Sequence, residues 1–125
     1  MVDYVLDSDI VINYLHQKKE AYSLIHKLGL SKISISVITY GEVLEGVFGD
    51  PRYETVRDYL QTILIYPVTI RTVELFAGIR KNLRKEGKII ESMDILIAST
   101  AMEHDLTLIT NNKKDFERID GLKLL

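Results

Sequence analysis

The chain has 125 residues, 46% of them hydrophobic and 27% charged, a balance typical of one globular domain with a real hydrophobic core. Its net charge of −2 argues against nucleic-acid binding through bulk positive charge, so contact with a polyanion needs a local basic patch or a bound cation. The absence of cysteine excludes disulfides and thiolate metal sites, and the lack of a long apolar run or a signal-peptide pattern indicates a cytoplasmic protein without a membrane anchor.

Short apolar runs alternate along the chain with segments of helical periodicity. The predicted strands are residues 4–6, 33–35, 66–70, 106–109 and 122–125. The predicted helices are residues 10–15, 20–28, 37–48, 53–63, 71–86, 93–104 and 113–118. Because the strands are apolar throughout and helices separate them, the sequence predicts an α/β fold. Its central sheet is mostly parallel, with four or five strands and helices on both faces.

Polar residues follow three of the predicted strands. Asp7 comes after residues 4–6, Ser36 after residues 33–35, and Thr110 to Asn112 after residues 106–109. In open parallel sheets, ligands bind outside the carboxyl ends of the strands. The sequence therefore places the chemistry of the protein at this edge of the sheet.

The segment YVLDSDIVINYL allows three interpretations of its acids: a helix cap, an aspartyl nucleophile or a metal ligand. Asp9 directly precedes the residues of helical periodicity, so we expect it to cap the helix that begins near Ile10. Asp7 is then left without a structural role. The nucleophile interpretation rests on DSDIV, which loosely matches the D-x-D-x-[TV] loop of haloacid-dehalogenase-like phosphatases. It is the weaker one, because no later Asp-Asp or Asp-Glu pair occurs.

Asp94 gives the strongest signal from the residues alone. At about 100° per residue it falls inside the helical arc of Ile97, Ala98 and Ala101. A carboxylate within an apolar stripe is costly unless it is paired, hydrogen-bonded or bound to a metal. Capping of the first helical turn is the alternative role, but Ser92 is predicted to serve as that cap.

Three further acids remain ambiguous. Helical projection places Glu45 nearer the apolar side of residues 37–48 and Glu42 on its flank, and a solvated or ion-paired glutamate is an open interpretation of both. Asp115 stands near the start of a short helix, where it either favours the helix dipole or joins the site. Oxygen ligands without Cys or His suit a hard cation such as Mg²⁺ or Mn²⁺, and clustered carboxylates repel each other without one.

Four segments, in order, resemble the motifs of PIN-domain nucleases, and among these the short VapC-type toxins of toxin–antitoxin systems. VLDSDIVI is similar to the opening L-D-[TS]-[ND]-x-x-I motif, and ISVITYGEVLEG to the S-x-x-[TS]-x-x-E-[LV]-x-x-G helix, which selects Glu42 over Glu45. GKIIESMDILIASTA is similar to the D-x-x-I-A-[AS] helix, and LTLITNNKKDFERIDGLKL to the closing L-x-T-x-N-x-x-D-F segment. The likeness spans nearly all of residues 1–125, taken as a single domain, with Asp9 standing where many members have Asn.

The resemblance implies an endoribonuclease that uses Mg²⁺, with Mn²⁺ able to substitute. Asp7 and Asp94 are then the primary metal ligands, while Glu42 binds the metal or orients the attacking water. The full set of metal-binding acids that it implies is Asp7, Glu42, Asp94 and Asp115. Ser8, Thr110 and Asn112 would not bind the metal themselves but would hold these carboxylates or the phosphate in place. It further implies a VapB-like antitoxin as partner and a homodimer of the toxin.

Five cations project to one side of the predicted helix 71–86 and the residues after it: Arg80, Lys81, Arg84, Lys85 and Lys88. Three interpretations stand: contact with an RNA backbone, a docking surface for an acidic segment of the antitoxin, or a solvated face. A second functional hypothesis is a catalytically silent PIN-like binding module that acts only through its partner. The presence of all four acids favours the nuclease.

Overall fold

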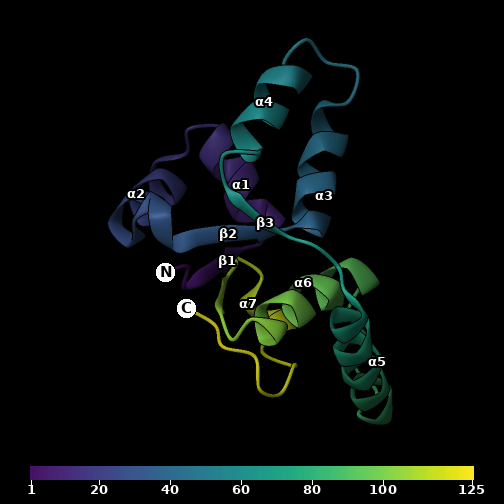
Figure 1. Cartoon of the computed structure of the whole chain (residues 1–125). Coiled ribbons are helices and arrows are strands. Elements are labelled where there is room, and N and C mark those ends of the chain that lie inside the picture. The colour runs from purple at the N-terminus through teal and green to yellow at the C-terminus, as the bar shows by residue number, and fades with distance from the viewer.

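The computed structural model describes all 125 residues and has a four-stranded sheet at its centre (Figure 1). Its strands are β1 (Tyr4–Leu6), β2 (Ile33–Ser36), β3 (Leu64–Tyr66) and β4 (Thr107–Ile109). The strand order is β3-β2-β1-β4, and all three pairings are parallel. The predicted α/β fold with a parallel sheet is therefore confirmed, with β1 in the interior of the sheet.

Seven α-helices and one 3₁₀ helix connect and cover the strands. They are α1 (Ser8–Leu15), α2 (Lys19–Leu28), η1 (Leu30–Lys32), α3 (Val37–Val47), α4 (Tyr53–Leu60), α5 (Ile70–Lys85), α6 (Ser92–Glu103) and α7 (Lys113–Phe116). In Figure 1, α1 to α4 lie on one side of the sheet and α5 to α7 on the other. None of these helices combines the length and the apolar composition that crossing a membrane requires.

The two faces of the sheet have separate hydrophobic cores. Successive side chains of a strand point to opposite faces, and β1 shows this directly. Val5 is buried in the cluster that contains Ile97 of α6, whereas Leu6 is buried in the cluster that contains Val43 of α3. Burial of each such side chain contributes about 1.5–3 kcal/mol to folding. The two cores hold the carboxyl end of β1 between α3 and α6.

The third strand lies earlier in the chain than predicted, and the fifth is nearly absent. Residues 66–70 were expected to form a strand, but β3 ends at Tyr66, directly before Pro67, and α5 begins at Ile70. The reason is a reciprocal cap: Thr72 N–H donates to Thr69 Oγ1 at 3.3 Å, and Thr69 N–H donates to Thr72 Oγ1 at 2.9 Å. Residues 122–125 form a single parallel bridge between Leu124 and Leu108 in place of the predicted strand.

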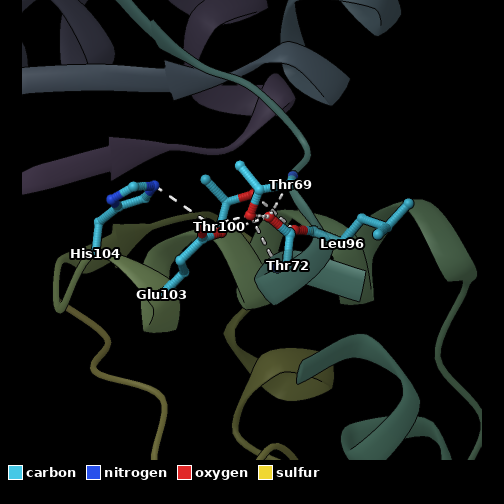
Figure 2. Close-up of polar contacts among 6 residues, drawn as sticks. All are labelled: Thr69, Thr72, Leu96, Thr100, Glu103 and His104. Carbon is cyan, nitrogen blue, oxygen red and sulfur yellow. Dashed lines mark hydrogen bonds and ion pairs between the residues drawn. The ribbon is translucent and has the colours of Figure 1, made fainter. Parts of the chain in front are cut away.

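A polar network joins the start of α5 to the end of α6 (Figure 2). The Glu103 carboxylate accepts hydrogen bonds from the Thr69 hydroxyl at 2.7 Å and from the Thr72 hydroxyl. Burial opposes ionisation of Glu103, but these hydrogen bonds outweigh it and hold its pKa below the usual value. Beside them, the His104 ring stacks on Tyr66 with 4.0 Å between ring centroids. The network fixes α6, the helix that carries Asp94.

Candidate active site

Asp7 occupies the N-cap position of α1, directly after β1. Its Oδ1 accepts from Ser8 N–H at 2.8 Å, and its Oδ2 accepts from Thr110 Oγ1 at 2.7 Å. The residue is only 6% exposed. Burial raises the pKa of Asp7, and the hydrogen bonds from Thr110 and Ser8 partly offset that increase. Asp7 is thus a buried carboxylate at the predicted edge of the sheet.

The expectation that Asp9 caps this helix is wrong. The helix begins at Ser8, earlier than periodicity predicts, because the carbonyl of Asp7 accepts from the N–H groups of Ile10 and Val11 at 3.2 and 3.3 Å. Asp9 instead accepts from Asn111 N–H through Oδ2 at 3.1 Å, while its Oδ1 is buried without a partner. Burial, together with the charge of Asp7, raises the pKa of Asp9. Asp9 therefore adds an unpaired oxygen beside Asp7.

Asp94 lies in the first turn of α6, where other acids from distant parts of the chain act on it. Burial raises its pKa to about 6, and the like charges of four acids add to the increase: Asp7, Glu42, Glu91 and Asp115. These acids come from the start of α1, from α3, from the residue before α6, and from α7. The structure thus brings Asp7, Glu42 and Asp115 into electrostatic range of Asp94.

The predicted cap of α6 is also corrected. Glu91 holds the N-cap position and its side chain makes no capping hydrogen bond, while Ser92 is the first helical residue. The Ser92 hydroxyl accepts from Nη2 of Arg80 at 2.7 Å, and Nη1 of Arg80 donates to the carbonyl of Ile90 at 2.9 Å. A guanidinium from α5 therefore ties down the segment that leads into Asp94.

Glu42 turns toward the site, and Glu45 is exposed to solvent. Ser8 Oγ donates to Glu42 Oε1 at 2.5 Å, which links α3 to the start of α1. Helical projection favoured Glu45 because it counted Val37 and Phe48 as core residues, whereas both are exposed. The resemblance to PIN-domain motifs selected the inward-facing glutamate.

Asp115 completes the acidic group from α7. Its Oδ2 accepts from Asn112 Nδ2 at 3.0 Å, and Oδ1 lies 3.8 Å from Nη1 of Arg118. Asn112 N–H in turn donates to Thr110 Oγ1 at 2.9 Å, the same hydroxyl that donates to Asp7. Thr110 and Asn112 therefore connect the carboxylates of Asp7 and Asp115, in the supporting positions that the resemblance implies.

Thr39, which was not among the predicted site residues, lies beside this group together with Ser36. Thr39 Oγ1 lies 3.4 Å from Ser8 Oγ and 3.5 Å from the carbonyl of Leu6, the last residue of β1. Ser36, which was expected at this edge of the sheet, caps α3 and accepts from Thr39 N–H at 3.1 Å. The S-x-x-T spacing at the start of a helix is a capping signal that could have identified Thr39.

The chemistry of the donor set fits a hard divalent cation, because every side chain offers carboxylate oxygens. In this structure no three Asp, Glu or His side chains lie close enough together to hold one ion jointly. The acids nevertheless raise the pKa of Asp94 through their charges, and Asp9 leaves a buried oxygen unpaired. A cation would relieve this repulsion and satisfy that oxygen.

Replacing Thr110 by valine is expected to weaken the ionised form of Asp7. The hydroxyl lowers the pKa of this carboxyl, so its removal raises the pKa further. The loss of a hydrogen bond to a charged group should lower the rate of RNA cleavage, the activity that the resemblance implies, by roughly tenfold at the acid end of the pH–rate profile and move its acid limb to higher pH. Thr107→Val in β4 is the matched control, and an unchanged profile for Thr110→Val would contradict the assignment.

Comparisons with known proteins identify the family of this chain. The family model described as "PIN domain" matches residues 4–122. The chain is 32% identical to "Ribonuclease VapC2" of Rickettsia felis, covering 97% of this chain and 95% of that protein, and 28% identical to "Ribonuclease VapC2" of Haemophilus influenzae, covering 98% and 96%. The crystal structure of VapBC2 from Rickettsia felis, bound to a promoter DNA fragment, is similar with a TM-score of 0.86 and 29% identity over 100% of this chain and 98% of that chain. The chain therefore belongs to the PIN-domain family, within its VapC group.

Proposed function

We propose that this protein is a metal-dependent endoribonuclease that acts as the toxin of a toxin–antitoxin pair. The observation that carries the proposal is the placement of Asp7, Glu42 and Asp115, from three other elements, close enough to Asp94 for their charges to act on it. The relatives named as VapC ribonucleases support RNA as the substrate and hydrolysis as the reaction. Membership of the PIN-domain family argues against the phosphatase alternative.

Each acid has a role in this proposal. Asp7 and Asp94 hold the cation, Glu42 binds it or orients the attacking water, and Asp115 completes the group. A bound Mg²⁺ or Mn²⁺ supplies a lowered pKa for its water and offsets charge on the scissile phosphate. Fixed hydroxyl and amide groups orient the carboxylates: Thr110 on Asp7, Ser8 on Glu42, and Asn112 on Asp115. The chain thus needs no histidine base.

The partner proposed for this chain is a VapB-like antitoxin. The Rickettsia felis structure is described as VapBC2 on its promoter DNA, and a structure from Haemophilus influenzae, 26% identical with a TM-score of 0.82, is described as VapBC-1. Both neighbours support an antitoxin for a chain of the same fold. The homodimer implied by the resemblance stays a prediction, which the mass of the purified protein in solution tests.

Metal removal tests the proposed activity. Purified protein is expected to cleave a labelled RNA in Mn²⁺ or Mg²⁺, to stop when EDTA is added, and to resume when the metal is restored, because the carboxylates alone do not activate water. Gel analysis of the RNA fragments measures this, and a small phosphomonoester serves as the substrate that should stay intact.

The control is the Asp7→Ala/Asp94→Ala protein, purified in the same way. Equal cleavage by this double variant would show that the activity belongs to a contaminant. A wild-type protein that binds RNA and metal but never cleaves would support the catalytically silent binding module instead.

A further inference from the structure

An open groove runs along α5 toward the start of α6. It is lined by Phe76, Ala77, Arg80, Lys81, Arg84, Lys85 and Ser92. Four of these seven residues are cations and none is an acid, although the chain as a whole carries a net charge of −2. Positive charge is therefore concentrated in one place on an otherwise slightly acidic molecule. Such a concentration is suited to a polyanion.

The four cations divide into two kinds. Arg80 donates to the Ile90 carbonyl and to the Ser92 hydroxyl, and its guanidinium lies 5.6 Å from the centre of the Phe76 ring. It is a structural residue of the groove. Lys81, Arg84 and Lys85 are exposed and make no hydrogen bond or ion pair with the protein. Lys88, beyond the groove, pairs with Glu86 at 3.3 Å. Three cations are thus free to bind a ligand.

These three cations lie close together along the helix. At about 1.5 Å of rise per residue, positions 81 to 85 span about 6 Å, and residues three and four apart share one face of a helix. Neighbouring phosphates of one strand can therefore be contacted together. The side chains of Phe76 and Ala77 provide an apolar lining next to them.

The groove ends at the first turn of α6, the turn that also carries Asp94. Ser92 lines the groove and is the first residue of α6, and Asp94 is the third. A strand whose phosphates lie along α5 would thus reach the helix that holds this carboxylate. An acidic protein segment would fit the charge, but the closeness of the groove to the turn that carries Asp94 favours RNA, the proposed substrate.

Building on the proposed function, we propose that Lys81, Arg84 and Lys85 bind the phosphates of the RNA strand that flanks the scissile bond. Arg80 is a positioning residue between this surface and Asp94. The groove thus supplies the positive charge that the whole chain lacks, and it does so beside a site that is itself negative.

The test is the salt dependence of RNA binding without metal. A fluorescein-labelled single-stranded RNA is titrated with the Lys81→Gln/Arg84→Gln/Lys85→Gln protein in EDTA, and anisotropy gives the Kd at several salt concentrations. Each phosphate contact with a single strand contributes about 0.7 to the slope of log affinity against log salt, so the slope should fall by about 2. The affinity at about 0.1 M salt should fall at least tenfold, with an unchanged Tm because the three side chains are exposed.

The matched control removes two lysines and one arginine elsewhere. Lys19 and Lys27 lie on α2 and Arg71 at the start of α5, outside the groove, and all three side chains are exposed. Their triple replacement by glutamine should leave the salt slope unchanged. An equal loss of slope in this control, or no loss in the groove variant, would overturn the proposal. A polyglutamate peptide that binds more tightly than RNA, and only when the groove is intact, would assign the groove to a protein partner and overturn it too.

Cleavage in Mn²⁺, measured in parallel, separates this inference from the activity on which it rests. If the groove variant loses salt dependence but the wild-type protein does not cleave RNA, the groove is an RNA-binding surface and the proposed nuclease activity is wrong. If the wild-type protein cleaves RNA and the variant keeps both the salt slope and the KM, the nuclease activity stands and the proposed role of the groove is wrong.

Discussion

Asp94→Asn is expected to lower RNA cleavage at least about a thousandfold while making the metal-free protein more stable. The loss of activity follows because the carboxylate is a proposed primary ligand, and stabilisation of transition-state charge by a metal amounts to several kcal/mol. Cleavage rates in Mn²⁺ measure the first effect. A variant with near-normal cleavage would remove Asp94 from the site.

The gain in stability follows from the pKa of the same group. Burial and like charges raise the Asp94 pKa from 3.8 to about 6, so between these values the folded protein binds more protons than the unfolded chain. The free energy of unfolding therefore decreases as pH rises through this window, and the charged carboxylate costs stability at neutral pH. Asparagine removes that cost.

Because Asp94 is only partly buried, only part of the shift counts, about 1 kcal/mol or a rise of about 4 °C in Tm. Thermal unfolding at neutral pH in EDTA measures this rise. The difference in Tm between the variant and the wild type should shrink near pH 4. Added Mn²⁺ should raise the Tm of the wild type more than that of the variant. A lower Tm for Asp94→Asn at neutral pH in EDTA would show that the acids do not strain the free protein.

Glu42→Gln is expected to lower cleavage about a hundredfold, and Glu45→Gln to leave it within about twofold. Both residues lie on α3 and both changes remove one negative charge, so any difference between the two variants comes from the position of the glutamate. The Glu42 carboxylate accepts a hydrogen bond from the hydroxyl of Ser8, the residue after Asp7, whereas Glu45 faces solvent. Cleavage rates at saturating RNA measure the difference. Equal losses in the two variants would point to the overall charge of α3 instead of a group in the site.

The alternation of strands and helices was predictable because each element carries its own periodicity. Local patterns failed where a short cap competes with β propensity. Ile70 reads as a strand residue, yet the paired hydroxyls of Thr69 and Thr72 start a helix there. Residues 122–125 have strand composition but form one bridge, at Leu124. Propensity is a weak prior wherever a specific hydrogen bond decides between two conformations.

The site was predictable in its acids and less so in their surroundings. Asp94 follows from amphipathicity, since its carboxylate falls within an apolar stripe. Asp7 follows from its position after the first strand, although the expectation that it has no capping role is wrong, because it is the N-cap of α1. Glu42 came only from the family resemblance, because the exposure of Val37 and Phe48 misleads any helical projection. The partner of Asp7, Thr110, lies 103 residues away, and that of Asp9, Asn111, lies 102 residues away. No local pattern contains contacts of that range.

The position of β1 has a consequence for synthesis on the ribosome. β1 pairs with β4, and Asp7 takes its hydrogen bond from Thr110, the residue just after β4 and 103 residues further along the chain. Contacts between distant parts of a chain form only after the intervening chain is available. A nascent chain therefore carries Asp7 well before it gains an ordered acidic group, because the segment that contains Thr110 and Asp115 must first leave the ribosome.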